Sequence, residues 1–175
     1  MSRIDCILIT GGYGFIGSKL TQALENDLPI VVVDNLLKQV HPDLSRAKFQ
    51  QGIDSFIGDI NDPKLWNSIF EKYVPRKIIH LAAETSTGVS AYKINVHTNA
   101  NINGLAVLLT SLTENNLHPD QFILASSRSV YGEGIWIDSN GSTQHAKPRE
   151  YKDLKSMKWL PRSRSGSNEI GRAHV

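Results

Sequence analysis

Three glycines near the start of the chain have the spacing of a phosphate-binding loop. Gly11, Gly14 and Gly17 follow an apolar run and precede a helical pattern. Glycines spaced in this way let the chain turn tightly, let a pyrophosphate approach the backbone, and let the helix pack on the strand. The phosphates would lie at the N-terminus of that helix, where free amide groups favour anions. We therefore expect dinucleotide binding here, with a tight structural turn as the alternative.

Two carboxylates stand where strands are expected to end. Asp34 follows the run Ile30–Val33, and its oxygens can accept the hydroxyl pair of an adenosine ribose while repelling a 2′-phosphate. This favours NAD over NADP. Asp59 follows a third apolar segment and is suited to accept the adenine amino group. The alternatives are a helix cap or a turn for Asp34 and a turn for Asp59.

A serine pair could contribute to catalysis. Ser126 and Ser127 come at the end of the apolar run Gln121–Ala125. Because strand carboxyl ends face the ligand crevice in a doubly wound sheet, the Ser127 hydroxyl would point toward the reactive end of the cofactor. Simple turn chemistry is the alternative. His80, near the end of another run, is interpreted as a buried core histidine and is given no role.

Apolar runs predict the strands that position these residues. Five runs recur along the chain, at Ile4–Ile9, Ile30–Val33, Ser55–Ile57, Lys77–Ala82 and Gln121–Ala125. Most intervals between them hold helical periodicity, and the second run is apolar throughout, as a strand buried on both faces should be. This alternation predicts an α/β fold with a parallel, doubly wound sheet and helices on both sides.

Three helices are expected between the strands. The first follows the glycine loop from Ile16 and ends near Asn26-Asp27. The second covers Leu65–Tyr73 at helical spacing until Pro75 stops it, and a longer one spans Ser90–Leu112.

Composition limits the class of protein. The 175 residues are 40% hydrophobic and 21% charged with a net charge of +2, which is ordinary for a soluble globular chain. A single cysteine, Cys6, permits no intrachain disulfide and suits a reducing compartment, so we expect the cytoplasm. The apolar N-terminal run is too short for a signal peptide or a membrane span. Basic residues cluster only weakly, between Lys147 and Arg164, so we expect neither nucleic acid nor a membrane as partner, and no metal.

The motifs taken together resemble a known family. Thr10-Gly-Gly-x-Gly-Phe-Ile-Gly, Asp34-Asn35, Gly58-Asp59-Ile60, His80-Leu-Ala-Ala, Asn101-x-x-Gly104 and Ser126-Ser127-x-x-Val130-Tyr131-Gly132 occur in order. They are similar to the extended short-chain dehydrogenase/reductases, and more narrowly to the NAD-dependent epimerase/dehydratase group. The resemblance covers Ile4 to Pro161 and is greatest to nucleotide-sugar 4-epimerases of the dTDP-L-rhamnose 4-epimerase-like type.

The resemblance implies a cofactor site and a reaction. The cofactor is NAD in a Rossmann-like fold, and its expected contacts are Gly11, Gly14, Phe15, Ile16, Gly17, Asp34, Asn35, Asp59, Ile60, Leu81, Ala82, Ala83, Thr85, Asn101 and Ser126. In the family a tyrosine phenolate removes a sugar hydroxyl proton, NAD takes the hydride, and the keto sugar is reduced again from its other face. Ser127 would hydrogen-bond the reacting oxygen. The implied partners are a nucleotide sugar and, for the full-length protein, a second copy in a homodimer.

The catalytic tyrosine and lysine of the family are not expected in this chain. Tyr151 and Lys155 satisfy Tyr-x-x-x-Lys, but the resemblance assigns them to an insertion that carries the pattern Arg149, Asp153-Leu154, Trp159 and Pro161. We interpret the pair as a decoy. Arg128 and Ser129 stand where dehydratases and decarboxylases carry acids, which favours an epimerase.

Three segments follow from this interpretation. Residues 1–134 form the NAD-binding part, residues 135–161 a polar insertion, and residues 162–175 a disordered, non-native tail. The end, Glu169 to Val175, resembles the translation of a sequencing-adapter DNA; an ordinary disordered tail is the alternative. We expect an incomplete sheet without the C-terminal substrate domain of the family, and a chain that is inactive alone. The rivals are an intact small enzyme that uses Tyr151 and Lys155, a non-catalytic NAD-binding module, and another nucleotide-sugar dehydratase or reductase.

Overall fold

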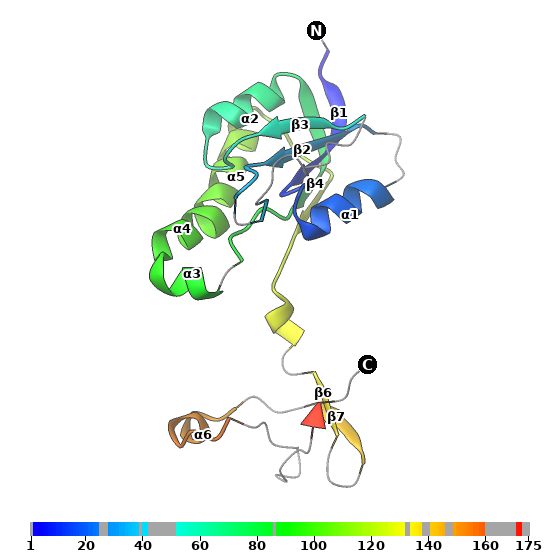
Figure 1. Ribbon diagram of the computed structural model, residues 1–175. Coiled ribbons are helices and arrows are strands. Elements are labelled where there is room, and N and C mark those ends of the chain that lie inside the picture. The colour runs from blue at the N-terminus through cyan, green and yellow to red at the C-terminus, as the bar shows by residue number, and fades with distance from the viewer. Residues whose placement is uncertain are drawn as a thin grey trace. The chain divides into compact units, whose positions relative to one another are not determined.

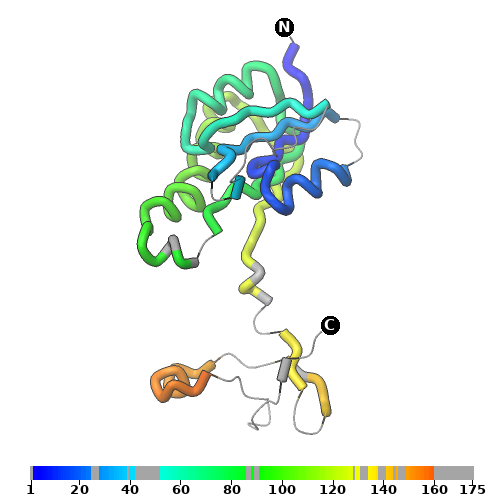
Figure 2. Tube along the Cα trace, viewed as in Figure 1, coloured from blue at the N-terminus to red at the C-terminus, as the bar shows by residue number. Residues whose placement is uncertain are grey.

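A computed structural model describes most of the chain as two compact units, Met1–Ala125 and Ser126–Val175 (Figure 1). The unit boundary follows the fifth strand, whereas the sequence places its change of composition after Gly134. Figure 2 traces the backbone, coloured by residue number from the N-terminus to the C-terminus. The described residues are 2–24, 28–38, 40–41, 52–85, 87–131, 134–137, 141–145, 149–159 and 171–172.

A five-stranded sheet forms the centre of the larger unit. All its pairs are parallel and its order is β3-β2-β1-β4-β5. The inner strands β1 and β2 are almost fully buried because their apolar runs are covered on both faces. The expected parallel sheet is confirmed, with strands β1 (Ile4–Thr10), β2 (Ile30–Asp34), β3 (Asp54–Ile57), β4 (Tyr73–His80) and β5 (Gln121–Leu124).

Helices cover both faces of this sheet, as expected for a doubly wound fold. On one face, helix α1 (Phe15–Ala23) packs Leu20 against a cluster that includes Ile9 and Val32. On the other, α2 (Pro63–Phe70) and α5 (Gly104–Glu114) bury Trp66 and Leu108 in the main core. The core is therefore two apolar layers divided by the sheet. The expected first-helix end near Asn26-Asp27 lies outside the described residues, and α1 ends earlier, at Ala23.

The second helix ends sooner than the sequence suggested. Tyr73 and Pro75 belong to β4, where the expectation was a helix that Pro75 would terminate. The register with β1 passes from Cys6–Pro75 to Ile7–Lys77, so Arg76 is an extra residue at a bulge. Because β5 pairs with β4 only from Lys77 onward, the amide that proline lacks falls at an irregular strand end, where it is tolerated.

The expected long helix Ser90–Leu112 is wrong as a single element. The structure has α3 (Thr87–Tyr92), α4 (Ile94–Thr98), a π-helical turn η2 (Asn99–Asn103) and then α5. The wide turn places Gly104 directly against Ile60, because a Cβ on Gly104 would lie 2.3 Å from the Ile60 Cδ1. Periodicity alone does not show such an insertion, because the apolar spacing continues on either side of it.

The smaller unit contains little regular structure. The strands β6 (Ile135–Ile137), β7 (Thr143–His145) and β8 (Gly171–Arg172) form an antiparallel sheet in the order β7-β6-β8. A short 3-10 turn, η3 (Arg128–Tyr131), precedes these strands, and α6 (Tyr151–Lys155) lies between β7 and β8 in the chain. Of the expected disordered tail, only Gly171 and Arg172 are described, and the rest lies outside the described residues.

Candidate functional site

The topology of the larger unit predicts a place for a ligand, a crevice at the switch point of the sheet. From β1 the chain proceeds to β2 and β3 on one side, and it then crosses to β4 on the other side of β1. Ligands of open α/β sheets bind outside the strand carboxyl ends at such a switch point. Here those ends are Thr10-Gly11 and His80-Leu81, which are direct neighbours, since the Leu81 amide donates to the Thr10 carbonyl at 3.0 Å.

The glycines of the loop divide into two groups by what surrounds them. Gly11 has a φ of +67°, and a Cβ there would lie 2.8 Å from the Ala82 nitrogen. A Cβ on Gly12 would lie 2.5 Å from a Val32 methyl, and one on Gly17 2.4 Å from the Gly11 carbonyl oxygen. At Gly14 the nearest atom would be the Gly11 oxygen, 3.2 Å away. Contacts within the fold thus require glycine at positions 11, 12 and 17. Gly14 is the loop glycine with space on one side that a ligand could occupy.

The N-terminus of α1 suits an anion. Gly14 is its N-cap with extended backbone, no side chain caps the helix, and the first turn contains no acidic residue. The first amide groups of a helix have no partners within the helix and carry a partial positive charge. Phe15 and Ile16 are 86% and 64% exposed beside them. An exposed apolar pair at an uncapped helix start fits a ligand with both phosphates and apolar rings.

Asp34 is buried, only 8% exposed, at the carboxyl end of β2. Its Oδ2 accepts the Tyr13 amide at 3.0 Å and its Oδ1 accepts the Leu36 amide at 2.9 Å. Leu36 has a φ of +49°, the left-handed turn that directs its amide back to the carboxylate. Asp34 is therefore a turn residue as well as a candidate ligand. Each carboxylate oxygen has a second lone pair with which it could accept a hydroxyl.

Tyr13 lies across this end of the sheet. Its hydroxyl is hydrogen-bonded to the Ser55 hydroxyl on β3, and its side chain packs against the apolar cluster that includes Ile9 and Val32. Tyr13, which lies between Gly12 and Gly14, thus connects the loop to both β2 and β3. The sequence analysis assigned no role to Tyr13, and only its place beside the loop glycines could have suggested one.

The other strand-end residues occupy different settings. Asn35 accepts the Leu37 amide at 3.1 Å, and the exposed Asp59 accepts the Asn61 amide at 2.9 Å. Ile60 is buried, and its carbonyl accepts the Trp66 indole at 2.8 Å. Asp59 thus has the turn contact weighed as its alternative, whereas Ile60 is a core residue in this structure. Their roles toward a cofactor stay predictions.

The segment after β4 passes beside the glycine loop. Leu81 and Ala82 are half-buried against Gly11, and Ala83 and Thr85 are exposed. Asn101 in η2 fixes the backbone of Glu84 from both sides: its Oδ1 accepts the Glu84 amide at 2.8 Å, and its Nδ2 donates to the Glu84 carbonyl at 3.0 Å. The expected ligand Asn101 is therefore also a clamp on this segment, and its contact with a cofactor stays a prediction.

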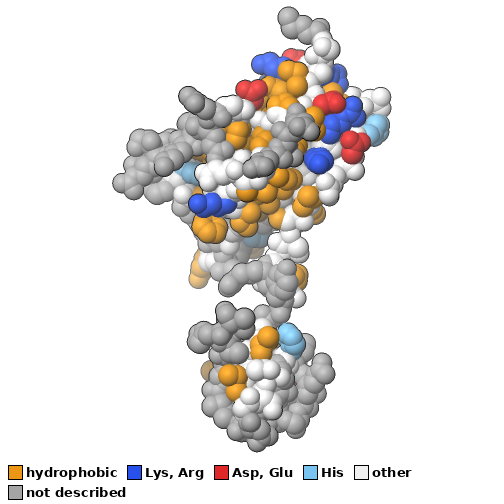
Figure 3. Space-filling view, turned by 90° about the vertical axis from the view of Figure 1, so that its right-hand side faces the viewer, with side chains coloured by type: hydrophobic (Ala, Val, Ile, Leu, Met, Phe, Trp, Pro, Cys, Tyr) orange, Lys and Arg blue, Asp and Glu red, His pale blue; other side chains and the backbone are white. Residues whose placement is uncertain are grey.

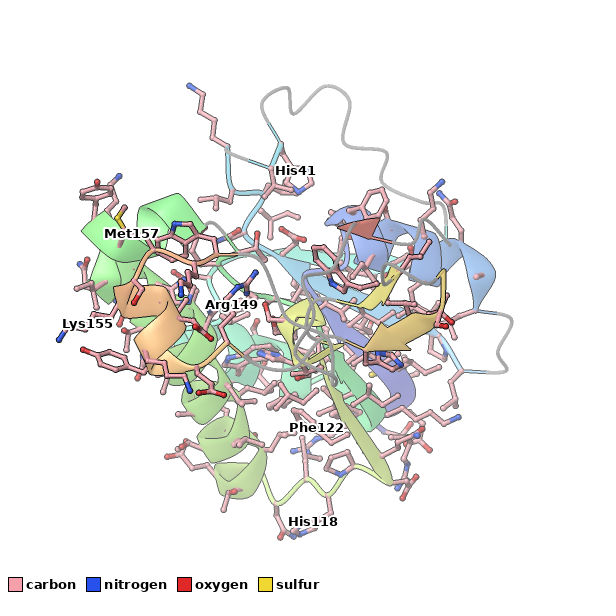
Figure 4. The ribbon with its side chains drawn as sticks, turned by 90° about the horizontal axis from the view of Figure 1, so that it is seen from below. His41, His118, Phe122, Arg149, Lys155 and Met157 are labelled. Atoms are coloured by element: carbon pink, nitrogen blue, oxygen red, sulfur yellow. The ribbon has the colours of Figure 1, made fainter. Side chains whose placement is uncertain are left out.

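The candidate catalytic residues lie in the smaller unit. The Ser127 hydroxyl accepts the Ser129 amide at 3.1 Å, which is the turn chemistry weighed as an alternative, and both Ser126 and Ser127 are exposed. Tyr151, 79% exposed, and the exposed Lys155, labelled in Figure 4, begin and end α6. Arg149, also labelled there, donates to the Trp159 carbonyl at 2.7 Å, so two residues of the expected insertion pattern contact each other. The catalytic assignment of Ser127 stays a prediction.

The surface of the larger unit carries charges of both signs. On the face drawn in Figure 3, basic and acidic side chains alternate near the N-terminal end, and apolar side chains gather beside them. Among the described residues, no group of three or more His, Cys, Asp or Glu side chains is placed to hold a metal ion. Within the same residues, every helix falls short of the length and apolarity needed to cross a membrane.

A family model decides the relationship. The model described as the NAD dependent epimerase/dehydratase family matches residues 7–153, which is most of the chain. The chain belongs to this family. The expected resemblance and the expected fold are confirmed, and the family description itself names NAD.

Relatives within the family are nucleotide-sugar 4-epimerases. The dTDP-L-rhamnose 4-epimerase of Burkholderia thailandensis is 33% identical over 155 residues, covering 87% of this chain and 43% of the relative. The UDP-glucose 4-epimerase of Thermotoga maritima, solved with UDP-glucose, has a TM-score of 0.59 at 28% identity, covering 81% and 45% of the two chains. The enzyme of Thermus thermophilus, solved with NAD, has a TM-score of 0.61 at 25% identity, covering 89% and 44%. The chain thus spans less than half the length of these family members.

The residues present fit a dinucleotide of the kind the family name specifies. Gly14 has an open side at an uncapped helix start, and the buried Asp34 has acceptor capacity at the adjacent strand end. Thr10 and His80, which the sequence interpretation left without a role, form a buried hydrogen bond between the two strands that border the crevice. The signal that could have identified them is that each is the polar residue ending an apolar run, and the ends of adjacent parallel strands are neighbours.

Proposed function

We propose that this chain binds NAD in the crevice at the carboxyl ends of β1 and β4, as the cofactor-binding part of a nucleotide-sugar 4-epimerase. The observation that carries the proposal is the surroundings of Gly14. Its three neighbouring glycines are required by contacts within the fold, whereas Gly14 has an open side at the start of an uncapped helix. A Cβ on Gly14 would meet one atom within 4 Å, the Gly11 oxygen at 3.2 Å, so packing constrains this glycine less than the other three. Its otherwise open side favours close approach of a phosphate.

The residues of the chain would bind the two halves of the cofactor differently. The amide groups at the start of α1 would donate to the pyrophosphate, and Asp34 would accept the adenosine ribose hydroxyls. A buried carboxylate repels a 2′-phosphate, so NAD is preferred over NADP. Phe15 and Ile16 supply exposed apolar surface beside the phosphates. When bound, NAD supplies the hydride acceptor and donor of the family reaction.

The substrate proposal rests on the relatives. Those compared above are named as epimerases of dTDP-L-rhamnose or UDP-glucose, so we assign the full-length protein a nucleotide sugar, with epimerisation at C4. Ser127 would hydrogen-bond the reacting sugar oxygen. We further propose that this chain does not turn over sugar alone, because the Tyr-x-x-x-Lys of the family is expected beyond Pro161 and not at Tyr151. A cytoplasmic homodimer is the proposed form of the full-length protein, on the strength of the resemblance and of the buried free thiol of Cys6.

A calorimetric titration of the chain with NAD tests the binding proposal. We expect saturable binding of NAD, weaker binding of NADP, and a loss of affinity by about tenfold or more in Gly14→Ala. Gly88→Ala is the matched control, because a Cβ at Gly88 meets nothing within 4 Å. Equal affinity of the Gly14→Ala variant and the unsubstituted chain would contradict the proposed site, and absence of any binding would contradict the proposed cofactor.

A further inference from the structure

His80 is a buried histidine for which the proposed reaction has no use. It ends β4 with only 4% of its surface exposed. Its Nδ1 lies 2.8 Å from the hydroxyl oxygen of Thr10, which ends β1. The two residues are also directly paired in the register of the strands. This pair therefore stands at the bottom of the crevice, beneath the glycine loop.

The Thr10 hydroxyl takes part in two hydrogen bonds, and these fix the direction of both. The Ala82 amide can only donate, and it reaches the Thr10 Oγ1 at 3.1 Å. Among the described residues, the one other group bonded to this oxygen is His80 Nδ1. The hydroxyl proton is satisfied only when Nδ1 accepts it, so the arrangement needs neutral His80 with its proton on Nε2.

This chain of bonds fixes the spacing of the two backbones that form the crevice. Thr10 holds the segment after β4 twice, since its carbonyl accepts the Leu81 amide at 3.0 Å and its hydroxyl accepts the Ala82 amide. Gly11 rests directly on the same segment, where a Cβ would lie 2.9 Å from the Leu81 carbonyl carbon. A small shift of Leu81 or Ala82 would therefore displace the first glycine of the loop or open a gap beneath it.

The far end of the segment is held independently. Asn101 bonds both the amide and the carbonyl of Glu84, as described above. The residues between Leu81 and Glu84 thus run between two fixed points. The hydroxyl of Thr10 is one of these points, and it depends on the imidazole of His80 for its orientation.

The surroundings of His80 keep it neutral. From β1 it meets Thr10, and from β5 it meets the ring of Phe122 at 6.5 Å between centroids (Phe122 is labelled in Figure 4). The residues buried on this face of the sheet include the apolar Ile78 and Leu108 and the uncharged Ser111 of α5. Burial lowers the pKa of His80, and no charged group contributes to the shift, neither Asp34 nor Glu84 included.

We propose that His80 is a positioning residue for cofactor binding: as the acceptor of the Thr10 hydroxyl proton, it holds the Leu81-Ala82 backbone at the distance from the glycine loop that the dinucleotide requires. The inference rests on the proposed NAD site, although His80 itself touches no cofactor. Protonation of Nδ1 would turn the acceptor into a donor, and the Thr10 hydroxyl proton would lose its partner. Affinity for NAD would then fall at acid pH.

Substitutions on both sides of the hydrogen bond test the proposal. Thr10→Val removes the hydroxyl at constant shape, His80→Phe removes the acceptor while keeping a ring, and Thr10→Ser restores the hydroxyl. His118→Phe is the control, because His118 is exposed and hydrogen-bonds only to Asn116 among the described residues. The readouts are the Kd of NAD from calorimetry between pH 8 and about 4.5, well below the ordinary histidine range, the melting temperature, and the hydrogen exchange rate of the Ala82 amide without NAD.

The proposal makes a connected set of expectations. Thr10→Val and His80→Phe each raise the Kd by about tenfold, the double variant raises it no further, and Thr10→Ser and His118→Phe bind as the unsubstituted chain does. The Kd of the unsubstituted chain rises only when the pH falls below the ordinary titration range of histidine, because burial lowers the pKa of His80, and this dependence disappears in His80→Phe. Ala82 exchange accelerates in both disrupting variants.

Each failure has a distinct signature. Unchanged Ala82 exchange in Thr10→Val, or an acid-side rise of the Kd that persists in His80→Phe, overturns the positioning role. If His80→Phe does not fold, the pH profile of the unsubstituted chain and the Thr10→Ser variant still test the positioning role. A Thr10→Ser variant that loses affinity for NAD would contradict that role. If the unsubstituted chain binds no NAD at all while Ala82 exchange still responds to Thr10→Val, the proposed function is wrong and the cofactor role assigned to His80 falls with it.

Discussion

The backbone amide of Tyr13 donates to Oδ2 of Asp34 at 3.0 Å, so a single carboxylate joins the glycine-rich loop to the end of β2. The other oxygen of the same carboxylate is bonded to the Leu36 amide. Asp34 therefore organises the crevice in addition to any ligand that it accepts. A substitution at this position has to be judged by stability and by binding together.

Asp34→Asn separates these two effects. The amide offers one acceptor oxygen, so either Tyr13 or Leu36 would face an NH₂ donor. A buried amide left without an acceptor costs about 1–3 kcal/mol of unfolding free energy. We expect a loss in that range by urea denaturation, together with weaker NAD binding and reduced preference for NAD over NADP by calorimetry.

The control for this substitution is Asp62→Asn. Asp62 caps α2 by accepting the Lys64 amide at 2.9 Å, and asparagine caps helices as well as aspartate does. We expect this variant to keep both stability and NAD affinity. If Asp34→Asn matched Asp62→Asn in both measurements, the bonds to Tyr13 and Leu36 would have no energetic role.

The glycines should differ in what their replacement damages. In Gly17→Ala the new Cβ would lie 2.4 Å from a carbonyl oxygen and 2.6 Å from the Gly12 Cα. The backbone must move, and we expect the unfolding free energy to fall by about 1–3 kcal/mol. In Gly14→Ala the nearest atom is at 3.2 Å, so we expect a loss below about 1 kcal/mol in urea denaturation despite the weakened NAD binding. Comparable destabilisation by both substitutions would show that Gly14 is a packing residue too.

Tyr151 and Lys155 should have no catalytic effect in this chain. The tyrosine is exposed at the start of a five-residue helix, and the lysine is exposed at its end. We expect no conversion of dTDP-L-rhamnose or UDP-glucose, followed by chromatography of the sugars, by the purified chain with NAD. Tyr151→Phe and Lys155→Met should bind NAD as the unsubstituted chain does. Turnover by the purified chain that Tyr151→Phe abolishes would establish it as an intact small enzyme.

The thiol of Cys6 reports on the fold. Burial in β1 is the main reason that its pKa rises from 9.0 to about 12, with a smaller contribution from Asp5. The folded protein should therefore not react with a thiol reagent at pH 8, and full labelling should require urea. Because folding raises the pKa of this thiol, its contribution to the free energy of unfolding is fully present below about pH 9. That contribution is lost as the pH rises toward 12. Cys6→Ala should flatten that part of the stability profile, and rapid labelling of the native chain would contradict the burial of β1.

Part of this structure follows from local pattern, and part does not. All five strands of the main sheet were predictable because each is a short apolar run next to a turn or helix signal, and the glycine loop because its spacing is tied to backbone geometry. The place of Pro75 within β4 was not predictable, because a strand tolerates proline there only if β5 begins to pair after it. The π-turn around Asn101 depends on bonds to Glu84, 17 residues away. The contact of Thr10 with His80 joins residues 70 apart. Each residue is the polar end of an apolar run, but only the strand order shows that the two ends are neighbours.

The outer edge of β5 should cause the chain to self-associate. β5 is an edge strand of the described sheet, and it exposes about half of the side chains of Ile123 and Leu124. An apolar edge with unpaired backbone groups is a template for pairing with another chain. We expect the apparent mass by light scattering to rise above 19.4 kDa with concentration, and Ile123→Lys to suppress the rise because a lysine blunts the edge. Thr110→Lys adds the same charge at an exposed position of α5, outside the strand itself, and should leave the association unchanged. Equal suppression by both lysines would show that net charge, not the β5 edge, controls the association.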